Sequence, residues 1–339
     1  MLVMCAGPFL RGLGRFLYRM PECGTGRLGV QRIHSVSVAT ASGAGPYVFL
    51  PHAEAPFVLG SRTYLANSGE HMATLRVLVT GSAGALGYRI ALGLSNRGHI
   101  VRGFDLRPQR LPGDHRIGSL LDVRALEDAA KGVDAIVHAA AVPERQNFAD
   151  ELVPNNIVGT HNVFEVARLR GVKRVINTSS IRVTGGLDWE SGCIGLDLGY
   201  VPCDHYGVSK ITGEVIGEMY SRRFAIAVVS VRIGWFVRNQ QEANLLPTLK
   251  AGPRIYLSHR DAQDFYVHAL EQPDIAHCAI YVTSRNGDDS AFDLEPARRI
   301  FGFVPQDSFP EGSQWSSSED FPSPLTAPSL RPNTDPSKA

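Results

Sequence analysis

The stretch VLVTGSAGALGYRI, residues 77–90, decides the fold. It opens with a short apolar run and continues at helical period after three glycines, Gly81, Gly84 and Gly87. A chain that passes from strand to helix through such a turn can bring backbone N–H groups and a helix N-terminus onto a phosphate. The GxxGxxG pattern therefore predicts a dinucleotide-binding unit, and a glycine-rich packing turn is the alternative.

Outward from this turn, strand-like and helical segments alternate along the chain. The predicted strands cover residues 75–79, 99–105, 134–140, 172–177, 225–234 and 277–283, and a loop is expected over 178–180. The predicted helices cover residues 85–98, 123–131, 155–171, 206–223, 261–271 and 294–301. Apolar runs too short for helices, separated by helices, indicate βαβ units. We expect an α/β fold: a Rossmann-type doubly wound parallel sheet with a small C-terminal substrate-binding lobe.

Composition divides the chain into four regions. Residues 1–71 are rich in Gly, Ser and Pro, and their first part carries several arginines and almost no acid. Such a start is typical of an organelle transit peptide, while a misassigned start codon upstream of Met72 is the simpler interpretation. After it we predict an NAD(P)-binding domain over 72–234, a substrate lobe over 235–312 and a disordered tail over 313–339.

The bulk composition excludes several classes of function. The 339 residues include 34 basic and 33 acidic side chains, so nothing favours a nucleic-acid or anionic-membrane partner. The five cysteines never fall in CxxC spacing, which argues against a metal site and suits a reducing compartment. No apolar run is long enough to predict a membrane span. We expect a cytoplasmic protein, or an organellar one if residues 1–71 are a genuine transit segment.

Asp105 ends the predicted strand 99–105, shortly after the glycine turn. A carboxylate there can accept hydrogen bonds from the adenosine ribose hydroxyls and would repel a 2′-phosphate, which favours NAD. Three arginines, Arg102, Arg107 and Arg110, surround it and could accommodate NADP. An aspartate that merely starts a turn is the structural alternative.

Tyr206 and Lys210 lie four residues apart at the start of a predicted helix and so share one helical face. A phenol, with a pKa of about 10, is too weakly acidic to serve as a base at neutral pH. A lysine ammonium one turn away, with a nicotinamide nearby, would lower that pKa. We predict Tyr206 as the acid/base, Lys210 as its tuner and a ribose ligand, and Ser180 as the group that orients the reacting oxygen. A packed tyrosine beside a serine-containing loop is the alternative.

Together these motifs resemble an extended short-chain dehydrogenase/reductase and, more narrowly, the NAD-dependent epimerase/dehydratase family. The motifs are TGSAGALG (80–87), Asp105, HAAA (138–141), NNIVGT (155–160), NTSS (177–180), YGVSK (206–210) and VRIG (231–234). The resemblance implies a cofactor site formed by Gly81, Gly84, Ala85, Leu86, Gly87, Asp105, Asp122, Val123, Ala139, Ala140, Ala141, Tyr206, Lys210 and Ile233. It also implies that Ser180, Tyr206 and Lys210 are the catalytic residues.

Within this family the chain looks closest to short members that act on free sugars or sugar acids, the uronate dehydrogenases especially. The segments YLSHRDAQDF (256–265) and GFVPQDSF (302–309) carry that similarity. The substrate side departs from the pattern, because Ile181 and Arg182 stand where the relatives carry Asn-His. The residues predicted to meet substrate are Ile181, Arg182, Trp235 and Arg254. Arg182 could clamp a carboxylate or phosphate, or be a solvated loop residue.

Four other polar residues are expected to support the fold rather than the reaction. Asn156 is expected to brace a helix or loop, with a proton-relay role as the alternative. Ser258 and Asp261 are expected to cap a helix, and His259 is expected at the surface.

The resemblance implies an oxidoreductase that transfers hydride between NAD, with NADP as the alternative, and a small sugar, sugar acid or related alcohol or carbonyl compound. One alternative is a sugar or nucleotide-sugar epimerase/dehydratase that keeps its cofactor bound. Another, different in class, is a non-catalytic NAD(P)-sensing binder. The resemblance further implies a homodimer that pairs two helices, at about 150–170 and at 206–223. No metal is expected.

Overall fold

The computed structural model describes residues 73–144, 146–190, 192–272, 275–284, 290–310 and Phe321. The predictions for residues 1–71, and for the tail apart from Phe321, concern residues outside this description. Phe321 itself is buried: its N–H donates to the Arg238 carbonyl (3.1 Å), and its ring lies 5.9 Å from that of Tyr88.

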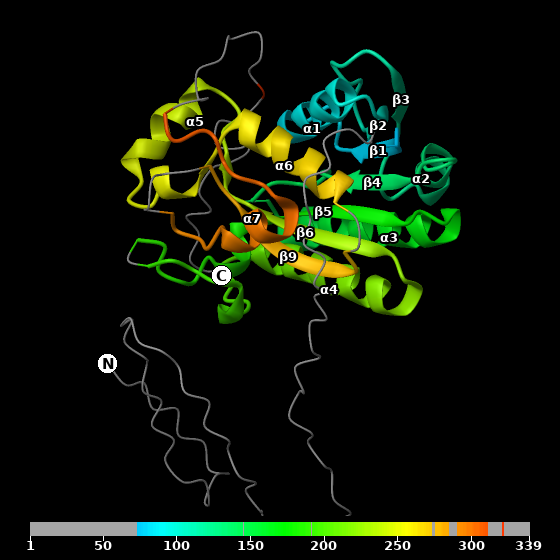
Figure 1. Cartoon of the computed structure of the whole chain (residues 1–339). Coiled ribbons are helices and arrows are strands. Elements are labelled where there is room, and N and C mark those ends of the chain that lie inside the picture. Colours follow the sequence, from blue (N-terminus) through cyan, green and yellow to red (C-terminus); the bar gives the residue numbers. More distant parts are fainter. Residues whose placement is uncertain are drawn as a thin grey trace, which may run out of the picture. The chain divides into compact units, whose positions relative to one another are not determined.

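Seven of the described strands form one parallel sheet in the order β3-β2-β1-β4-β5-β6-β9 (Figure 1). The strands are β1 (Arg76–Thr80), β2 (Ile100–Asp105), β3 (Asp114–Ile117), β4 (Ala135–His138), β5 (Arg174–Ser180), β6 (Ala227–Ile233) and β9 (His277–Val282). The order reverses between β1 and β4, and open α/β sheets bind ligands outside the carboxyl ends of strands at such a point. The predicted doubly wound parallel sheet is confirmed.

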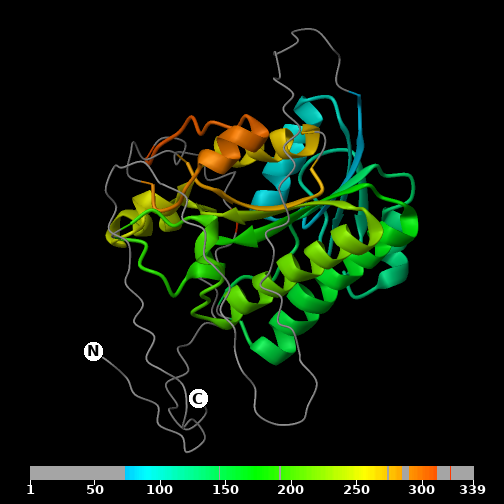
Figure 2. The same cartoon turned by 60° about the horizontal axis from the view of Figure 1, so that its bottom comes forward.

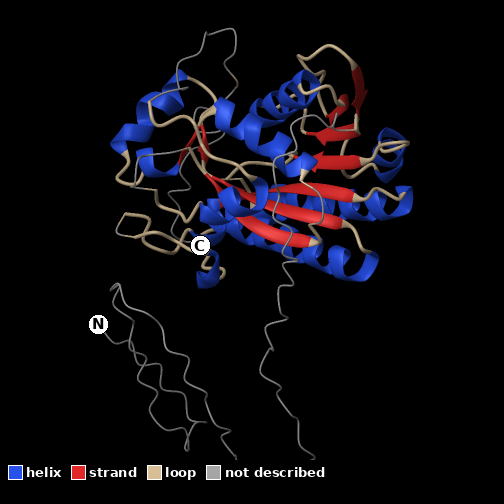
Figure 3. Cartoon of the chain, viewed as in Figure 1, coloured by secondary structure: helices blue, strands red, loops and turns tan. Residues whose placement is uncertain are grey.

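Helices cover both faces of the sheet, as Figure 3 shows. They are α1 (Ala85–Asn96), α2 (Val123–Ala129), α3 (Gly159–Arg170), α4 (His205–Phe224), α5 (Gln240–Leu245), α6 (His259–Glu271) and α7 (Glu295–Phe301). One core cluster joins α1, α6 and α7 to one face, and a second joins α2, α3 and α4 to the other. In Figure 2, α3 and α4 run side by side along their face.

The two cores explain why the central strands read as continuous apolar runs. Val77 and Val79 of β1 belong to the first cluster, whereas Leu78 belongs to the second, so successive side chains enter opposite layers. All three are fully buried. A strand covered on both faces cannot alternate between apolar and polar residues.

Several elements were not predicted from the sequence. The edge strand β3 consists of DHRI, which has no apolar run. An eleven-residue π-helix, η1 (Phe148–Val158), precedes α3 and contains Pro154. β7 (Trp235–Phe236) and β8 (Tyr256–Leu257) form a two-stranded parallel sheet of their own. The shorter 3₁₀ turns are η2 (Ile181–Thr184), η3 (Leu196–Leu198), η4 (Leu246–Thr248) and η5 (Pro253–Ile255).

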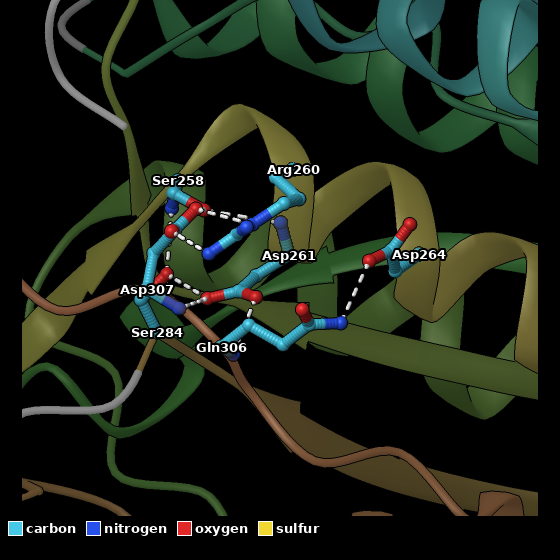
Figure 4. A network of polar contacts seen from close by, with 7 residues as sticks. All are labelled: Ser258, Arg260, Asp261, Asp264, Ser284, Gln306 and Asp307. Carbon is cyan, nitrogen blue, oxygen red and sulfur yellow. Dashed lines mark hydrogen bonds and ion pairs between the residues drawn. The ribbon is translucent and has the colours of Figure 1, made fainter. Parts of the chain in front are cut away.

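A buried polar network ties residues 306 and 307 to the start of α6 (Figure 4). The Asp261 carboxylate accepts hydrogen bonds from the backbone N–H groups of Gln306 (2.8 Å) and Asp307 (3.1 Å) and from the Ser284 hydroxyl (2.6 Å). Ser258 caps α6 by accepting from the Asp261 N–H (3.0 Å), and its hydroxyl donates to Asp307 (2.7 Å). Because Asp261 is buried, its pKa is raised. The network fixes the chain after α7.

The expectation for this helix start was half right. Ser258 is the cap, but the Asp261 side chain binds the C-terminal segment instead of its own helix. His259 is buried, contrary to expectation: its Nε2 lies 2.7 Å from the Val237 carbonyl oxygen, and its ring stacks on Phe236 at 4.6 Å. Among the described residues no helix is both long and apolar enough to cross a lipid bilayer.

Candidate active site

The glycine turn after β1 forms a tight backbone cradle. Gly81 has a φ of +74°, in the region that favours glycine, and its N–H donates to the Phe104 carbonyl at 2.8 Å. A Cβ on Gly81 would lie 2.6 Å from the Ala140 nitrogen, and one on Gly87 would lie 2.1 Å from the Gly81 carbonyl oxygen. The turn therefore packs backbone to backbone against the segment after β4, and no larger residue fits.

The start of α1 suits an anion. Gly84 is its N-cap and offers no side-chain cap, and the first turn contains no acidic residue. The N–H groups that open a helix lack partners within it and carry the positive end of the helix dipole. Ala85 and Leu86 stand in that first turn. These residues, together with the glycine cradle, fit the pyrophosphate of a dinucleotide.

The Asp105 carboxylate lies at the carboxyl end of β2, where it meets the glycine turn. Its Oδ2 accepts from the Ala83 N–H at 3.1 Å, and its Oδ1 accepts from the Arg107 N–H at 3.0 Å. The Arg107 Nε is 3.9 Å away, while Arg102 pairs with Asp114 at 2.6 Å and so faces elsewhere. A carboxylate fixed in this way suits ribose hydroxyls and leaves little room for a 2′-phosphate.

The remaining cofactor candidates lie along the same edge of the sheet. Asp122 caps α2, and its Oδ1 accepts from the Ala125 N–H at 3.1 Å, so its side chain is engaged in the cap. Val123 beside it is 39% exposed. Ile233 ends β6, next to Val282 of β9. Ala139, Ala140 and Ala141 follow β4, and the Ala139 N–H donates to the Thr80 carbonyl at 3.2 Å.

The three predicted catalytic residues lie where the carboxyl end of β5 meets the first turns of α4. Tyr206 and Lys210 share one face of α4, and the Lys210 Nζ lies 5.5 Å from the centre of the tyrosine ring. The same Nζ donates to the Thr178 carbonyl of β5 at 3.0 Å. Ser180 ends β5, and its Oγ accepts from the Arg182 N–H at 3.2 Å. A Cβ on Gly207 would lie 2.5 Å from the Arg182 carbonyl oxygen, so glycine allows this close approach.

Electrostatics separate the roles of the phenol and the amine. Burial raises the pKa of Tyr206, and the Glu144 carboxylate raises it further, whereas the Arg238 and Arg182 guanidinium groups lower it. Burial lowers the pKa of Lys210 to about 8, against a raising effect of Glu214. Without cofactor the phenol therefore holds its proton, and the amine is mostly charged at neutral pH. Shifts of this kind cluster at functional sites.

One turn beyond Lys210, the Glu214 side chain binds α4 to the sheet. Its carboxylate accepts from the Ser179 hydroxyl of β5 at 2.5 Å and pairs with Arg232 of β6 at 2.9 Å. Tyr200 also donates to it at 3.1 Å. The Glu214 and Arg232 side chains are 1% and 5% exposed, so the pair is a buried one.

Asn156 braces the loop after β4, as expected. Its side-chain amide exchanges two hydrogen bonds with the backbone of Val142, at 2.8 and 2.9 Å, and donates to Ser209 of α4 at 3.2 Å. His138 at the end of β4 contacts Thr80 (2.8 Å) and Thr160 (3.0 Å), and burial lowers its pKa to about 3. The imidazole is therefore neutral and structural.

The substrate side contains a charged cluster around Arg182. Its Nε lies 2.9 Å from the Asp204 Oδ2 and 3.4 Å from the Glu144 Oε2, and a second guanidinium nitrogen also contacts Asp204. Asp204 is itself the N-cap of α4, with its Oδ1 accepting from the Gly207 N–H at 2.7 Å. Arg182 is thus held in place rather than solvated.

Of the other predicted substrate residues, Ile181 and Trp235 belong to one apolar cluster, whereas Arg254 is held by backbone carbonyls. Ile181 is buried at the start of η2, next to Ser180. Trp235 lies in β7, with its Nε1 3.5 Å from Glu242. The Arg254 guanidinium instead donates to backbone carbonyls of Trp189 (2.6 Å), Glu190 (2.6 Å), Gly192 (3.1 Å) and Ser290 (3.4 Å). Sequence reasoning missed Glu144 and Asp204, whose only signal was their position directly after a predicted strand and before a predicted helix.

Comparison with known proteins agrees with this geometry. Residues 77–245 match the model of the NAD dependent epimerase/dehydratase family. A uronate dehydrogenase of Pseudomonas syringae pv. tomato is 34% identical over 62% of this chain and 75% of its own length. An L-arabinose 1-dehydrogenase (NAD(P)(+)) of Haloferax volcanii is 29% identical over 69% of this chain and 97% of its own.

Solved structures lead to the same family. The crystal structure of a mutant uronate dehydrogenase from Agrobacterium tumefaciens, complexed with NAD, superimposes with a TM-score of 0.61. It is 27% identical and covers 69% of this chain and 86% of its own. The glycine cradle, the acid after β2 and the Tyr-Lys pair agree with this likeness, and the chain belongs to the NAD-dependent epimerase/dehydratase family of extended short-chain dehydrogenases/reductases, enzymes whose cofactor is NAD.

Proposed function

We propose that this oxidoreductase transfers hydride between NAD and a hydroxyl-bearing carbon of a small sugar, sugar acid or related compound, with Tyr206 as the acid/base. The observation that carries the proposal is the Lys210 ammonium. It is held by the Thr178 carbonyl one helical turn from Tyr206, on the side where the cofactor segments converge.

In this mechanism the protein's own residues manage one proton. Tyr206 takes the hydroxyl proton as the carbon is oxidised, and Lys210 favours the phenolate electrostatically. Ser180 orients the reacting oxygen by hydrogen bonding. Lys210 also serves as a ribose ligand. Bound NAD supplies the hydride acceptor. The similarity to uronate and arabinose dehydrogenases supports a free sugar or sugar acid as the substrate class.

The test is an NADH-absorbance screen of the full chain with NAD or NADP and a panel of aldoses, uronates and polyols. Turnover that depends on Tyr206 supports the dehydrogenase. No net NADH, together with co-purified NAD, would instead indicate an epimerase or dehydratase. Unchanged behaviour of Tyr206→Phe would indicate a non-catalytic binder.

We also propose a homodimer formed through α3 and α4, and a cytoplasmic location. The exposed large apolar side chains on these two helices support the dimer: Leu169, Val208, Val215, Met219 and Phe224. Light scattering after size exclusion tests it, and a monomer at all concentrations would contradict it. Cell fractionation tests the location.

A further inference from the structure

Three charged side chains from three different loops meet at the open side of Tyr206. Arg182 comes from η2, Asp204 caps α4, and Glu144 lies in the segment after β4. Their side chains are 31%, 28% and 31% exposed, respectively. All three are therefore partly open to solvent and close enough to the Tyr206 phenol to act on it electrostatically.

Arg182 is already neutralised by this cluster. Asp204 holds two of its nitrogens and is fixed in turn by the helix cap. Glu144 adds a second carboxylate at 3.4 Å from Nε. Arg238, the other guanidinium that acts on Tyr206, pairs with Glu242 at 2.8 Å. The guanidinium groups of Arg182 and Arg238 and the carboxylates of Glu144 and Asp204 all act on the Tyr206 phenol, and each guanidinium is already paired with a carboxylate.

Glu144 is the more loosely held of the two partners of Arg182. Its 3.4 Å separation from Nε is longer than the roughly 2.7–2.9 Å of a charge-assisted hydrogen bond. A carboxylate can accept about four hydrogen bonds. Glu144 thus retains acceptor capacity toward a ligand with hydroxyl groups.

Building on the proposed function, we infer that the substrate is a neutral polyhydroxyl compound, an aldose or related lactol or polyol, and that Glu144 accepts hydrogen bonds from its hydroxyl groups. A uronate or sugar phosphate would bring a further negative charge to a guanidinium that already holds two carboxylates. Like charges placed together are disfavoured and exclude the wrong ligand. Glu144 therefore determines specificity by selecting against anions.

The experiment compares matched pairs that differ only in charge: D-glucose with D-glucuronate, and D-galactose with D-galacturonate. Steady-state kcat/KM with NAD is measured for wild type, Glu144→Gln and Glu144→Ala. Wild type is expected to favour each neutral sugar by at least about tenfold. Glu144→Gln should move that ratio toward the uronate by about tenfold, and Glu144→Ala should raise KM for the neutral sugar more than it lowers kcat.

The matched control is Glu190→Gln. This carboxylate pairs with Lys250 at 3.3 Å and is 48% exposed, so its loss should leave the ratio unchanged. A wild-type preference for the uronate overturns the inference whatever the variants do. A neutral preference that Glu144→Gln leaves intact overturns the role of Glu144.

Titration calorimetry of the same sugars into the enzyme–NADH complex separates this inference from the proposed function. Preferential binding of the neutral sugar without turnover sustains the inference and contradicts the proposed dehydrogenase. No binding of any sugar contradicts both. Unchanged circular dichroism and NAD affinity establish that each variant is folded.

Discussion

Lys210 lies one turn below Tyr206 on α4, and its ammonium is bound to the Thr178 carbonyl at 3.0 Å while remaining 5.5 Å from the tyrosine ring centre. The amine is thus held by strand β5 and not by the residue it influences. It can stabilise a phenolate through space without competing for the proton that Tyr206 exchanges. The first predictions test this arrangement.

Tyr206→Phe removes the exchangeable proton while keeping the ring. We expect kcat to fall about 10²- to 10⁴-fold, the usual contribution of a general acid or base, with NAD affinity changed little. Tyr220→Phe is the control, because Tyr220 lies near the other end of α4 and its hydroxyl donates to Glu165 of α3 (2.8 Å). A Tyr206→Phe enzyme with full activity would contradict the assignment.

Lys210→Met should change how stability depends on pH. Burial lowers the pKa of Lys210 to about 8 from an ordinary 10.5, so between these values the folded protein binds fewer protons than the unfolded one. Wild-type stability should therefore rise, relative to Lys210→Met, as pH increases from about 8 to about 10.5. Urea unfolding of both proteins at several pH values measures this. Parallel curves would show that the folded amine titrates normally.

Removing only one partner of the buried Glu214–Arg232 ion pair should lower the free energy of unfolding. Glu214→Leu or Arg232→Met alone leaves a buried charge without its partner and should destabilise by about 3–5 kcal/mol. The double variant should be less destabilised than the sum of the two single changes. Urea unfolding of the wild type, the two single variants and the double variant gives the coupling energy of a double-mutant cycle. Simple additivity would argue against a coupled pair.

Gly87→Ala should weaken NAD binding. The added Cβ would lie 2.1 Å from the Gly81 carbonyl oxygen, and crowding of this kind costs about 1–3 kcal/mol. Gly192→Ala is the control, because no atom lies within 4 Å of its Cβ position. Titration calorimetry with NAD measures both, and equal affinities would show that the turn does not cradle the cofactor.

Asp105→Ala should relax the preference for NAD over NADP. Removal of the carboxylate removes its repulsion of a 2′-phosphate, and Arg107 remains nearby, so the ratio of kcat/KM values should shift toward NADP by at least about tenfold. Asp114→Ala serves as the control, since Asp114 pairs with Arg102 away from the turn. An unchanged ratio would mean that Asp105 only supports the loop.

The elements that the sequence predicted are those with strong periodicity. The helix expected over 85–98 spans Ala85–Asn96, and the strand expected over 172–177 spans Arg174–Ser180, so it includes the serines expected in a loop. β3 escaped prediction because an edge strand needs no apolar face. The helix expected over 155–171 includes the end of η1, and the first part of η1 escaped prediction because its proline argues against a helix. In both cases tertiary contacts decided the outcome.

The helix that carries Tyr206 and Lys210 and the glycine turn before α1 were also predictable, since both depend on local spacing. The cluster of charged side chains around Arg182 could not be predicted. Arg182, Asp204 and Glu144 are separated by up to 60 positions and meet only because parallel strands deliver their loops to one edge. A single sequence contains no signal for such a meeting.

The contacts of Glu214 bear on which parts of this protein can change during evolution. Glu214 binds α4 to β5 and β6, so the helix that carries Tyr206 is held on the sheet by more than the Asp204 cap at its start. Substitutions in the surrounding loops that keep Asp204 should therefore leave the position of this helix unchanged. An ancestral enzyme could in this way acquire new sugars while its reaction stayed the same.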